Sequence, residues 1–409
     1  MMENVDVLIV GGGPAGLAAA VRLKENGIED ILVAEREHAL GGILRQCIHD
    51  GFGLARFGES LSGPEYAARF ISRARELQIR CLTDAAVTRI TPDRVVTIVT
   101  RSGLKHVRAK AVVLAMGCRE RTRGALAIPG ERPAGVYTAG VAQAYMNLYD
   151  RMPARDAIIL GSGDIGLIMA RRLTLEGARV QAVYEVLPYP SGLTRNVHQC
   201  LEDYGIPLIL SHTVTKIHGD KRLEGVTVSR VDAQMRPVPG TEEYHACDTL
   251  ILSVGLIPEN ELSLDAGVML DKRTGGADVD ERYQTSVPGI FAAGNVLQVH
   301  DLADLVSEEA EALADAVGRY LSEPMFPAGS RKVRCGPRVR YTVPQRVNGC
   351  QEFILSLRVT EPMRDVAVTV RQGDRIIGRR KMRKALPAEL IRLKVTPSDG
   401  EEDIEVTIE

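Results

Sequence analysis

The sequence lacks long hydrophobic runs, paired cysteine motifs and any marked net charge. The first two of these shortages each exclude a class of protein. No stretch of about 18 or more uncharged apolar residues occurs, so we expect no transmembrane helix. The seven cysteines are odd in number and none are spaced as Cys-x-x-Cys, which disfavours a disulfide scaffold, a zinc ribbon or a cysteine-ligated cluster. We therefore expect no metal site, and any iron–sulfur centre to belong to a partner protein.

Length and composition indicate a folded protein of several domains. The chain has 409 residues, more than the roughly 250–300 at which one hydrophobic core stops growing. Apolar residues make up 45% and charged residues 25%, as in ordinary globular proteins. The first four residues, Met1 to Asn4, lack the basic segment of a signal peptide, so we expect a cytoplasmic protein.

The first strong motif predicts a dinucleotide-binding unit. It consists of a strand, a glycine turn, a helix and a second strand that ends in an acid, at residues 5–10, 11–16, 14–26 and 31–35. Gly11 permits the turn, Gly13 lets the backbone approach a pyrophosphate and Gly16 lets helix and strand pack closely. Glu35 stands where a carboxylate accepts hydrogen bonds from ribose hydroxyls. The alternative is a glycine turn without a ligand.

A second copy of this unit begins at residue 157. Gly161, Gly163 and Gly166 follow its first strand, and Glu185 ends its second strand, 24 residues after the first glycine, as in the first unit. Two dinucleotides in one chain indicate electron transfer between a flavin and a nicotinamide. Glu185 would repel a 2′-phosphate, which favours NAD(H) over NADP(H), although Arg195 is near enough to reverse that preference.

A third glycine site completes the predicted flavin frame. A buried strand ends at Gly294 and Asn295, and a helix begins near Val306. The N-terminus of that helix would stabilise the anionic reduced flavin, or it is an ordinary capped helix. Earlier segments predict a helix from Ser62, a hairpin over 95–107 and buried strands over 110–117 and 248–255, with the crossings between domains near Gly117 and Gly255.

The three glycine sites, in this order, resemble the pyridine-nucleotide-dependent FAD oxidoreductases, a superfamily of flavoproteins with two dinucleotide-binding domains. The resemblance covers residues 3–325. It implies an α/β fold of two Rossmann-like domains, the FAD domain over 1–118 and 256–325 and the NAD(H) domain over 119–255. The chain departs from the disulfide reductases, because Leu44 and His49 stand where those enzymes carry two cysteines. It also has Asn295 where the superfamily commonly has Asp.

A narrower resemblance points to subunits of larger dehydrogenases. Residues 41–53, 117–121 and 294–296 are similar to the NAD/FAD oxidoreductase subunits that accompany anaerobic glycerol-3-phosphate dehydrogenase or dye-linked amino-acid dehydrogenases, among them proline dehydrogenase, opine oxidase and cyanide synthase. The glycerol-phosphate companion is the preferred subgroup. The resemblance implies hydride transfer between NAD(H) and FAD, and electron exchange with a partner flavoprotein dehydrogenase or a small iron–sulfur or cysteine-rich protein.

The motifs and the resemblance together give a set of expected site residues. The expected dinucleotide contacts are Gly11, Gly13, Pro14, Ala15, Gly16, Glu35, Arg36, Gly42, Ile43, Val87, Ala115, Gly117, Gly161, Gly163, Asp164, Ile165, Gly166, Glu185, Gly255, Gly294, Asn295, Asp301 and Val306. The catalytic candidates are Cys47, as a flavin-adjacent thiol, and His49, as a proton carrier. Hydride transfer needs no general base, so both residues could equally serve shape and hydrogen bonding.

The last 79 residues differ in charge and pattern from the rest. Residues 331–409 hold 17 Lys and Arg against 11 Asp and Glu, whereas residues 1–330 hold 34 against 42. Apolar residues alternate over 353–359, 366–370 and 391–395, which predicts a small all-β sandwich. The basic cluster over 379–384 is either a docking surface for an acidic redox partner or a solvated face.

Three functions remain open at this point. The favoured one is an NAD(H)- and FAD-dependent oxidoreductase that exchanges electrons with a partner. The second is a thiol or persulfide reductase that uses Cys47 with an external thiol. The third is a non-catalytic flavoprotein subunit of an assembly. Nucleic-acid binding is disfavoured, because residues 331–409 contain only two aromatic residues for base stacking, Tyr341 and Phe353.

Overall fold

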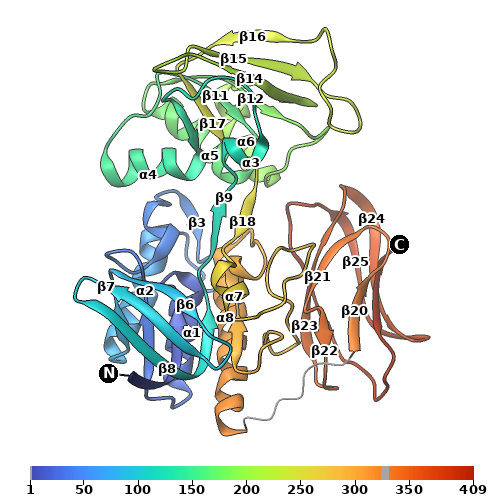
Figure 1. Cartoon of the computed structure of the whole chain (residues 1–409). Helices are drawn as coiled ribbons and strands as arrows, with labels where there is room; N and C mark the ends of the chain where they lie inside the picture. Colours follow the sequence, from blue (N-terminus) through green and yellow to red (C-terminus); the bar gives the residue numbers. More distant parts are fainter. Residues whose placement is uncertain (1, 324–330) are drawn as a thin grey trace. The chain divides into compact units, whose positions relative to one another are not determined.

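The computed structural model describes residues 2–323 and 331–409, and the chain divides into two compact units (Figure 1). Unit 1 comprises Met1–Cys118 and Pro258–Glu409, and unit 2 comprises Arg119–Ile257. The chain passes between them at two short paired strands, β9 (Cys118–Glu120) and β18 (Leu256–Pro258). Residues 326–330, where the sequence pattern changes, lie outside the described residues.

Unit 1 contains a seven-stranded sheet in which the first three parallel strands have the Rossmann order. The order is β5-β2-β1-β8-β7-β6, with β19 paired to β8. The strands are β1 (Met2–Val10), β2 (Ile31–Ala34), β5 (Arg80–Leu82), β6 (Ala85–Ile90), β7 (Val95–Thr100), β8 (Gly103–Leu114) and β19 (Ile290–Ala292). Because β2 and β8 flank β1 on both sides in parallel, the carboxyl ends of three strands meet beside the turn that follows β1.

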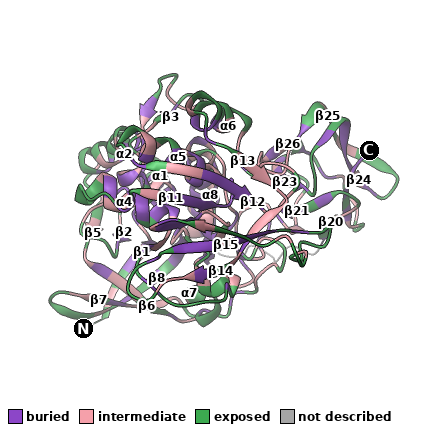
Figure 2. Ribbon diagram, turned by 90° about the horizontal axis from the view of Figure 1, so that it is seen from above, coloured by how far each residue is buried: buried purple, intermediate pink, exposed green. Residues whose placement is uncertain are grey.

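Helices cover one face of this sheet, and both faces are buried. The helices are α1 (Pro14–Glu25), α2 (Gly63–Glu76) and α8 (Ala303–Ser322). Alternate residues of β1 enter two different cores: Val7 and Ile9 pack with the helices, and Leu8 and Val10 pack on the opposite side. Figure 2 marks the buried parts of the chain in purple. Burial on both faces explains why these strands are continuously apolar in sequence.

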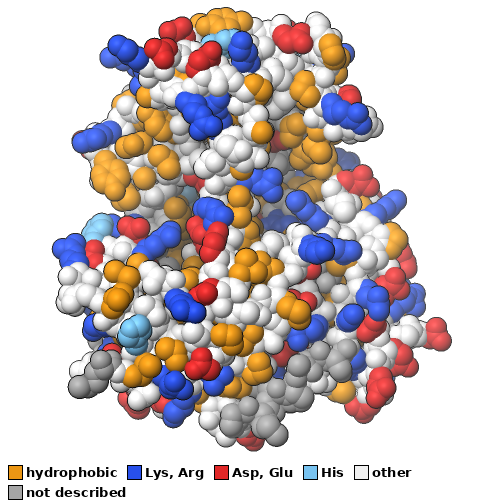
Figure 3. Space-filling view, in the orientation of Figure 1, with side chains coloured by type: hydrophobic (Ala, Val, Ile, Leu, Met, Phe, Trp, Pro, Cys, Tyr) orange, Lys and Arg blue, Asp and Glu red, His pale blue; other side chains and the backbone are white. Residues whose placement is uncertain are grey.

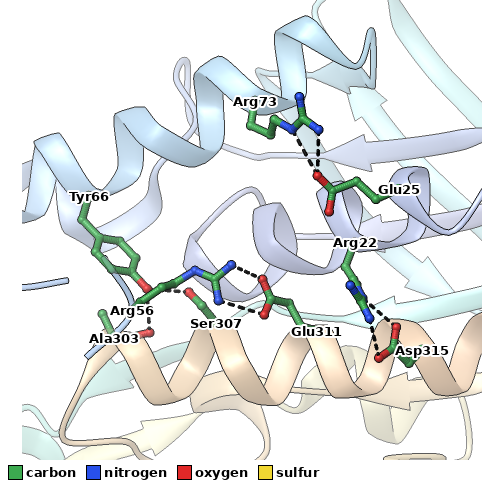
Figure 4. Close-up of polar contacts among 9 residues, drawn as sticks. All are labelled: Arg22, Glu25, Arg56, Tyr66, Arg73, Ala303, Ser307, Glu311 and Asp315. Carbon is green, nitrogen blue, oxygen red and sulfur yellow. Dashed lines mark hydrogen bonds and ion pairs between the residues drawn. The ribbon is translucent and has the colours of Figure 1, made fainter. Parts of the chain in front are cut away.

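Helix α8 is fixed to its neighbours by polar contacts as well as by packing (Figure 4). Arg22 on α1 donates to Asp315, and Arg56 pairs with Glu311. The hydroxyl groups of Tyr66 and Ser307 lie 2.8 Å apart in the buried interior. At the start of α8, the Asp304 carboxylate accepts the backbone N–H groups of Gly53 and Ala55 at 3.0 and 2.9 Å. Three different segments, α1, the loop after β3 and α2, therefore depend on the position of α8.

Unit 2 repeats the Rossmann order. Its parallel sheet has the order β10-β17-β11-β12-β13, formed by β10 (Val136–Thr138), β11 (Asp156–Leu160), β12 (Arg179–Glu185), β13 (Leu208–Leu210) and β17 (Thr249–Leu252). Helix α5 (Asp164–Leu175) connects β11 to β12, as α1 connects β1 to β2. A separate antiparallel sheet consists of β14 (His212–His218), β15 (Gly225–Arg230) and β16 (Glu243–Ala246).

Shorter elements complete the two units. In unit 1 these are η1 (Gly42–Gln46), β3 (Asp50–Phe52), β4 (Leu61–Ser62), α7 (Glu261–Asp265) and η3 (Gly294–Val296). In unit 2 they are α3 (Arg123–Leu126), α4 (Ala139–Tyr149), α6 (Thr194–Cys200) and η2 (Glu202–Tyr204). Within the described residues, none of the helices is long and apolar enough to cross a membrane.

The C-terminal sheets, which we define as the strands within Arg331–Glu409, belong to unit 1. Five strands form one sheet in the order β22-β20-β27-β24-β25, and three form another in the order β21-β23-β26. Their bounds are β20 (Arg331–Cys335), β21 (Val339–Val343), β22 (Arg346–Val347), β23 (Phe353–Val359), β24 (Met363–Gln372), β25 (Arg375–Ala385), β26 (Ile391–Val395) and β27 (Ile404–Ile408). Side chains from both sheets share one hydrophobic core.

Buried and half-buried arginines tie the C-terminal sheets to the rest of unit 1. Arg346 pairs with Asp278 at 2.5 Å, and Arg392 pairs with Glu308 on α8 at 2.6 Å. Arg358, only 8% exposed, donates to the carbonyl of Val299 at 2.9 Å. The basic C-terminal residues are therefore not all solvated, since several hold this part of the chain to α8 and the loops beside it.

Most predicted elements are confirmed, with two differences. The second strand of the predicted hairpin and the buried strand after it are one continuous strand, β8, whose outer half pairs with β7 and whose inner half lies between β1 and β19. The helix predicted to begin near Val306 begins three residues earlier, at Ala303, so that Asp304 lies in its first turn. A carboxylate in the first turn complements the helix dipole.

One buried carboxyl group in unit 1 has a pKa well above its ordinary value. Asp280 is 1% exposed, and its Oδ1 atom accepts the N–H groups of Arg282 and Gln284 at 2.9 and 3.0 Å. Burial, together with the charge of Glu281, raises its pKa to about 6, although the backbone donors and Arg346 act in the opposite direction. The ionised form is therefore destabilised in the folded protein.

The Asp280→Asn variant tests this assignment. The folded-state pKa of Asp280 lies above its ordinary value of 3.8, so the folded protein binds the proton more tightly and this group stabilises the fold as the pH falls through about 6. Between pH 8 and pH 5 the wild type should gain about 1 kcal/mol of unfolding free energy that Asp280→Asn does not gain. Urea denaturation at both pH values measures this difference, and equal pH dependence in the two proteins would contradict it.

Candidate dinucleotide-binding sites

The turn after β1 is closed so tightly that two of its glycines are obligatory. Gly11 has φ of +106°, and a Cβ atom there would lie 2.4 Å from the Ala115 carbonyl oxygen. A Cβ atom on Gly16 would lie 1.9 Å from the Gly11 carbonyl oxygen. These contacts bring the carboxyl ends of β1 and β8 and the first turn of α1 together, as the sequence predicts.

A buried carboxylate fixes the turn from the end of β2. The Oε2 atom of Glu35 accepts the N–H of Gly12 at 2.7 Å, and its Oε1 atom accepts the N–H of Glu37 at 2.8 Å. The carbonyl of Gly12 in turn accepts the N–H of Gly41 at 2.8 Å. Glu35 is 5% exposed, so these donors are what compensates for its lost hydration. The carboxylate has lone pairs left for a ribose hydroxyl.

Gly13 differs from its neighbours because no close contact within the described residues requires it to be glycine. Its φ is −81°, which any residue adopts, and a Cβ atom there would find Gly42 Cα nearest, at 3.8 Å. The position is the N-cap of α1, where a glycine offers no side chain to cap the first N–H groups of the helix. The open space at Gly13, which a Cβ atom would fill, lies at the N-terminus of α1 and suits the pyrophosphate of FAD.

The third glycine turn lies against the first. Gly294 has φ of +78°, and a Cβ atom there would lie 2.9 Å from the Ala15 side chain on α1. Asn295 follows it, and its side-chain oxygen accepts the N–H of His300 at 3.0 Å. Its amide nitrogen lies 3.5 Å from Cys118 Sγ. The structure thus brings Ala15, Gly294 and Asn295 into one region of unit 1.

A buried ion-pairing group supports this third turn. Glu309 on α8 accepts the N–H of Gly294 at 2.8 Å and the side-chain amide of Gln298 at 2.7 Å, and it lies 3.2 Å from His300 Nε2. Burial by itself raises the pKa of Glu309, but His300 and the two donors outweigh it, so that the pKa lies below its ordinary value. The carboxylate stays ionised and accepts all three donors.

The turn after β11 in unit 2 repeats the geometry of the first turn. Gly161 has φ of +95°, and a Cβ atom there would lie 2.1 Å from the Ser253 carbonyl oxygen. A Cβ atom on Gly166 would lie 2.5 Å from the Ser253 Cβ atom. Ser253 follows β17 as Ala115 follows β8, and its hydroxyl group accepts the N–H of Gly166 at 3.1 Å. Gly255, two residues later, has φ of +104°, and a Cβ atom there would come no closer than 3.8 Å to its neighbours.

Glu185 holds this second turn as Glu35 holds the first. Its Oε2 atom accepts the N–H of Ser162 at 2.9 Å, and its Oε1 atom accepts the N–H of Leu187 at 3.0 Å. Two hydroxyl groups, from Ser162 and Ser191, add hydrogen bonds of 2.5 and 2.9 Å to Oε2. Glu185 therefore carries more internal partners than Glu35, and the segment after β12 folds back over the turn.

Asp164, at the first position of α5, also holds that segment. Its Oδ1 atom accepts the N–H of Leu193 at 2.8 Å and the side-chain amide of Asn196 at 2.7 Å. Ile165 follows it on the helix and is half-buried. The predicted nucleotide contact of Asp164 thus coexists with a structural role, because the carboxylate shapes the loop beside the helix N-terminus.

Cys47 and His49 lie on the connection between η1 and β3 in unit 1. The Cys47 thiol donates to the Ile43 carbonyl at 3.3 Å, and the Cys47 carbonyl accepts the N–H of Gly63 at the start of α2. Burial raises the pKa of the Cys47 thiol to about 12. The His49 ring packs 5.1 Å from the ring of Phe52, and its Nδ1 atom lies 3.1 Å from the Asp50 carbonyl.

The remaining predicted residues divide between the turns and other surroundings. Ala115 and Val306 are buried, and Gly42 lies against Gly13. Arg36 and Ile43 are exposed, Val87 packs at the edge of the sheet core, and Gly117 has open space around it. Asp301 has the least expected surroundings, since its two carboxylate oxygens face Arg358 and the N–H of Leu390, both within the C-terminal sheets' region, at 3.4 Å.

Several residues with a clear role in these turns were not predicted. Ser191 and Asn196 hold the second turn, Glu309 holds the third, and Arg358 reaches Asp301, which lies 57 residues away in sequence. In the sequence, Glu309 is indistinguishable from a solvated helix residue. Ser162 carries a signal that could have found it, because it stands where the first unit has Gly12 and so adds a hydroxyl group beside Glu185.

The Cys47 thiol should be unreactive in the native protein. A thiol with a pKa of about 12 is almost wholly protonated at pH 8, and the thiolate is the reactive form. The pKa of Cys350 is also raised, mainly by its hydrogen bond with Asp399, but its side chain is exposed, so iodoacetamide should modify Cys350 faster than Cys47. Peptide mass mapping over time measures both rates, with Cys350→Ser as the control that removes the fast site. Modification of Cys47 at the rate of a free thiol would contradict the assignment.

Known proteins are similar to this chain in sequence and in fold. Hydrogen cyanide synthase subunit HcnB of Pseudomonas protegens is 26% identical over 72% of this chain and 66% of its own length. An opine oxidase subunit of Agrobacterium tumefaciens is 25% identical over 72% of this chain and 62% of its own length. The chain thus spans slightly less than two thirds of each relative. The crystal structure of thioredoxin reductase from T. acidophilum matches with a TM-score of 0.64 and 25% identity, covering 78% of this chain and 98% of that one.

The family assignment rests on a match to a family model. Residues 5–313, which include both glycine–carboxylate turns and the third glycine turn, match the pyridine nucleotide-disulphide oxidoreductase family. The chain belongs to the pyridine nucleotide-disulphide oxidoreductase family and is an FAD- and NAD(P)H-dependent oxidoreductase with a two-Rossmann fold.

Proposed function

We propose that the chain transfers a hydride between NAD(H) and FAD and exchanges the electrons with a partner protein. In this proposal the domain over 1–118 and 256–325 holds FAD, and the domain over 119–255 holds NAD(H). The observation that carries the proposal is a repeated pair of hydrogen bonds, which we call the clamp. In each unit the buried acid, Glu35 or Glu185, accepts one backbone N–H from the glycine turn and a second from the residue two positions after the acid. Two clamps of one design favour two ligands of one chemical class.

The residues of the chain would position the cofactors rather than take part in bond breaking. FAD supplies the two-electron acceptor. The amides at the start of α1 and the open position at Gly13 would bind its pyrophosphate, and Glu35 its ribose. Asn295 would accept from or donate to the flavin side without adding charge. The ionised Glu309 would keep Gly294 in its left-handed conformation.

The second clamp favours NAD(H) as the nicotinamide nucleotide. A buried carboxylate at the end of β12 repels the 2′-phosphate of NADP(H). Arg195, the base that could reverse this preference, is an exposed residue of α6. Glu185 would accept from the ribose hydroxyls while Ser162 and Ser191 keep its carboxylate in place.

The thiol-dependent alternative has less support. A thiol–disulfide exchange at the flavin needs two sulfur atoms and a reactive thiolate. Leu44 and His49 occupy the two expected cysteine positions, and burial raises the pKa of Cys47 to about 12. An external thiol would have to supply the second sulfur, and the Cys47 thiol would still have to lose its proton.

The partner would dock on the C-terminal sheets, which we interpret as a β-sandwich. Strand β25 ends the five-stranded sheet, and Arg379, Arg380, Lys381, Arg383 and Lys384 are exposed on it. Opposite Arg379 to Met382, β24 presents uncharged residues, so these bases have no acidic residue directly across the strand pair. Their exposed positive charge favours attraction of an acidic partner. Figure 3 shows Lys and Arg side chains over these sheets, interspersed with acidic ones.

The kind of partner follows from chemistry and from the relatives. Within the described residues, no cluster of three His, Cys, Asp or Glu side chains could hold a metal ion, so a one-electron metal centre would belong to the partner. Two relatives, the cyanide synthase and opine oxidase proteins, are named as subunits of those enzymes. The partner would be a flavoprotein dehydrogenase, or a small iron–sulfur or cysteine-rich protein. The preferred subgroup makes this chain the companion of an anaerobic glycerol-3-phosphate dehydrogenase.

An anaerobic titration tests the hydride transfer. NADH added to the purified protein should bleach the flavin absorption band near 450 nm, with one equivalent per FAD. The same bleaching in Cys47→Ser would support transfer without the thiol, because no bond to sulfur forms in the proposed reaction. A protein that purifies without flavin, or a band that NADH leaves unchanged, would sink the proposal.

The matched pair Glu35→Ala and Glu185→Ala tests the assignment of the two clamps. Each substitution leaves two backbone N–H groups without acceptors, at a cost of about 1–3 kcal/mol each. Glu35→Ala should lower FAD content or affinity by about tenfold or more. Glu185→Ala should keep its FAD and raise the KM for NADH by a similar factor. Absorption spectra and steady-state kinetics measure both, and the opposite pattern would reverse the assignment.

Charge reversal on β25 tests the docking surface. The variant Arg379→Glu, Lys381→Glu, Arg383→Glu should reduce an acidic ferredoxin about tenfold more slowly than wild type at low salt, because attraction between opposite charges raises encounter rates. Its rate with an uncharged quinone, whose encounter rate does not depend on the charge of β25, serves as the control. Equal ferredoxin rates in wild type and variant, at both low and high salt, would refute docking at β25.

A further inference from the structure

Arg358 is a buried cation of the C-terminal sheets, and its guanidinium contacts the segment beside the third glycine turn. Its guanidinium donates to the Tyr341 hydroxyl at 3.0 Å and to the Pro387 carbonyl at 2.9 Å within the C-terminal sheets' region. A third nitrogen donates to the Val299 carbonyl at 2.9 Å and lies 3.4 Å from the Asp301 carboxylate. The Arg358 and Asp301 side chains are each 10% exposed. A buried charge persists only where partners replace its hydration.

The partners of Arg358 on the flavin side flank a single residue. Val299 and Asp301 stand on either side of His300, whose N–H donates to Asn295 and whose ring faces Glu309. Glu309 in turn accepts the N–H of Gly294. The guanidinium therefore fixes the peptide that carries His300, and through His300 and Glu309 it reaches the Gly294–Asn295 turn.

A second arginine acts on the same stretch of chain. Arg392 on β26 pairs with Glu308, the neighbour of Glu309 on α8, at 2.6 Å. The N–H of Leu390, just before β26, lies 3.4 Å from the second oxygen of Asp301. Residues 299–309 are thus held from the C-terminal sheets at four points: Val299, both oxygens of Asp301, and Glu308. Two residues that contact the third glycine turn, His300 and Glu309, lie directly beside these points.

We propose that Arg358 is a positioning residue for the flavin site. It fixes the conformation of the Gly294–Asn295 turn through Asp301, His300 and Glu309. The proposal rests on the proposed function, because it assumes that FAD binds at this turn. It assigns the C-terminal sheets a role in cofactor binding in addition to partner docking. Loss of the guanidinium should release His300 and Glu309 from their present geometry and weaken FAD binding without removing any residue that touches the cofactor.

Arg346 offers a matched control. It also joins the C-terminal sheets to the rest of unit 1 through an aspartate, with two bonds to Asp278 at 2.5 and 3.2 Å and a side chain 14% exposed. Asp278 is 16 residues from Gly294 in sequence and lies outside the segment 299–309 that Arg358 and Arg392 hold. Replacing Arg346 or Arg358 by methionine removes an ion pair between the C-terminal sheets and the rest of unit 1, so that general destabilisation affects both variants.

The experiment compares full-length wild type, Arg358→Met and Arg346→Met after removal and re-addition of FAD. FAD fluorescence quenching gives the dissociation constant, and dye equilibration gives the flavin midpoint potential. Arg358→Met should raise the dissociation constant about tenfold or more and shift the potential, and Arg346→Met should stay within about threefold of wild type at the same potential. Thermal unfolding of the apo-proteins should show comparable destabilisation of both.

The outcomes separate the two proposals. If wild type binds no FAD, the proposed function fails and this inference fails with it. If wild type binds FAD and both variants bind it equally well at the same potential, Arg358 is a structural residue only and the inference alone is overturned. Should Arg358→Met not fold, Arg358→Lys replaces it: the retained charge cannot reach all four acceptors, so a loss of FAD affinity beyond that of Arg346→Met is expected. Equality of Arg358→Lys and Arg346→Met would overturn it.

Discussion

The hydrogen bond from a glycine-turn amide to a buried carboxylate is the constraint on which both dinucleotide units depend. Glu35 and Glu185 are each nearly inaccessible to solvent, and each accepts a turn amide and the amide two residues after the acid itself. A buried carboxylate without such donors would be too costly. The acid therefore fixes the turn, the turn fixes the helix N-terminus, and the helix N-terminus creates the place for a phosphate.

Helix α8 supplies the corresponding constraint for the third turn. Its first residues accept backbone N–H groups from the loop after β3 through Asp304 and from Gly294 through Glu309. Its other contacts reach α1 through Asp315 and the C-terminal sheets through Glu308 (Figure 4 shows the former). One helix thereby connects the turn after β1, the turn after β19 and the C-terminal sheets, so that a shift of α8 would disturb all three.

Local geometry was predictable from the sequence, and long-range contacts were not. The glycines at 11, 16, 161 and 166 report backbone collisions within one supersecondary unit, so their spacing alone predicts the turns. The sequence does not predict that β8 is one continuous strand. Its outer half is largely exposed, and the gap in the apolar pattern there resembles the end of a strand. Arg358 and Ser191 were missed because a basic residue in a strand and a serine in a loop carry no sign of a partner far away in sequence.

The central claim is that one chain carries two independent dinucleotide sites of the same design. Isothermal titration calorimetry of the FAD-loaded protein with NAD⁺ measures this directly, with flavin absorbance recorded before and after the titration. The structure predicts one NAD⁺ per chain and one FAD retained throughout. Release of FAD as NAD⁺ binds, or the absence of a second site while FAD is bound, would contradict the two-site account.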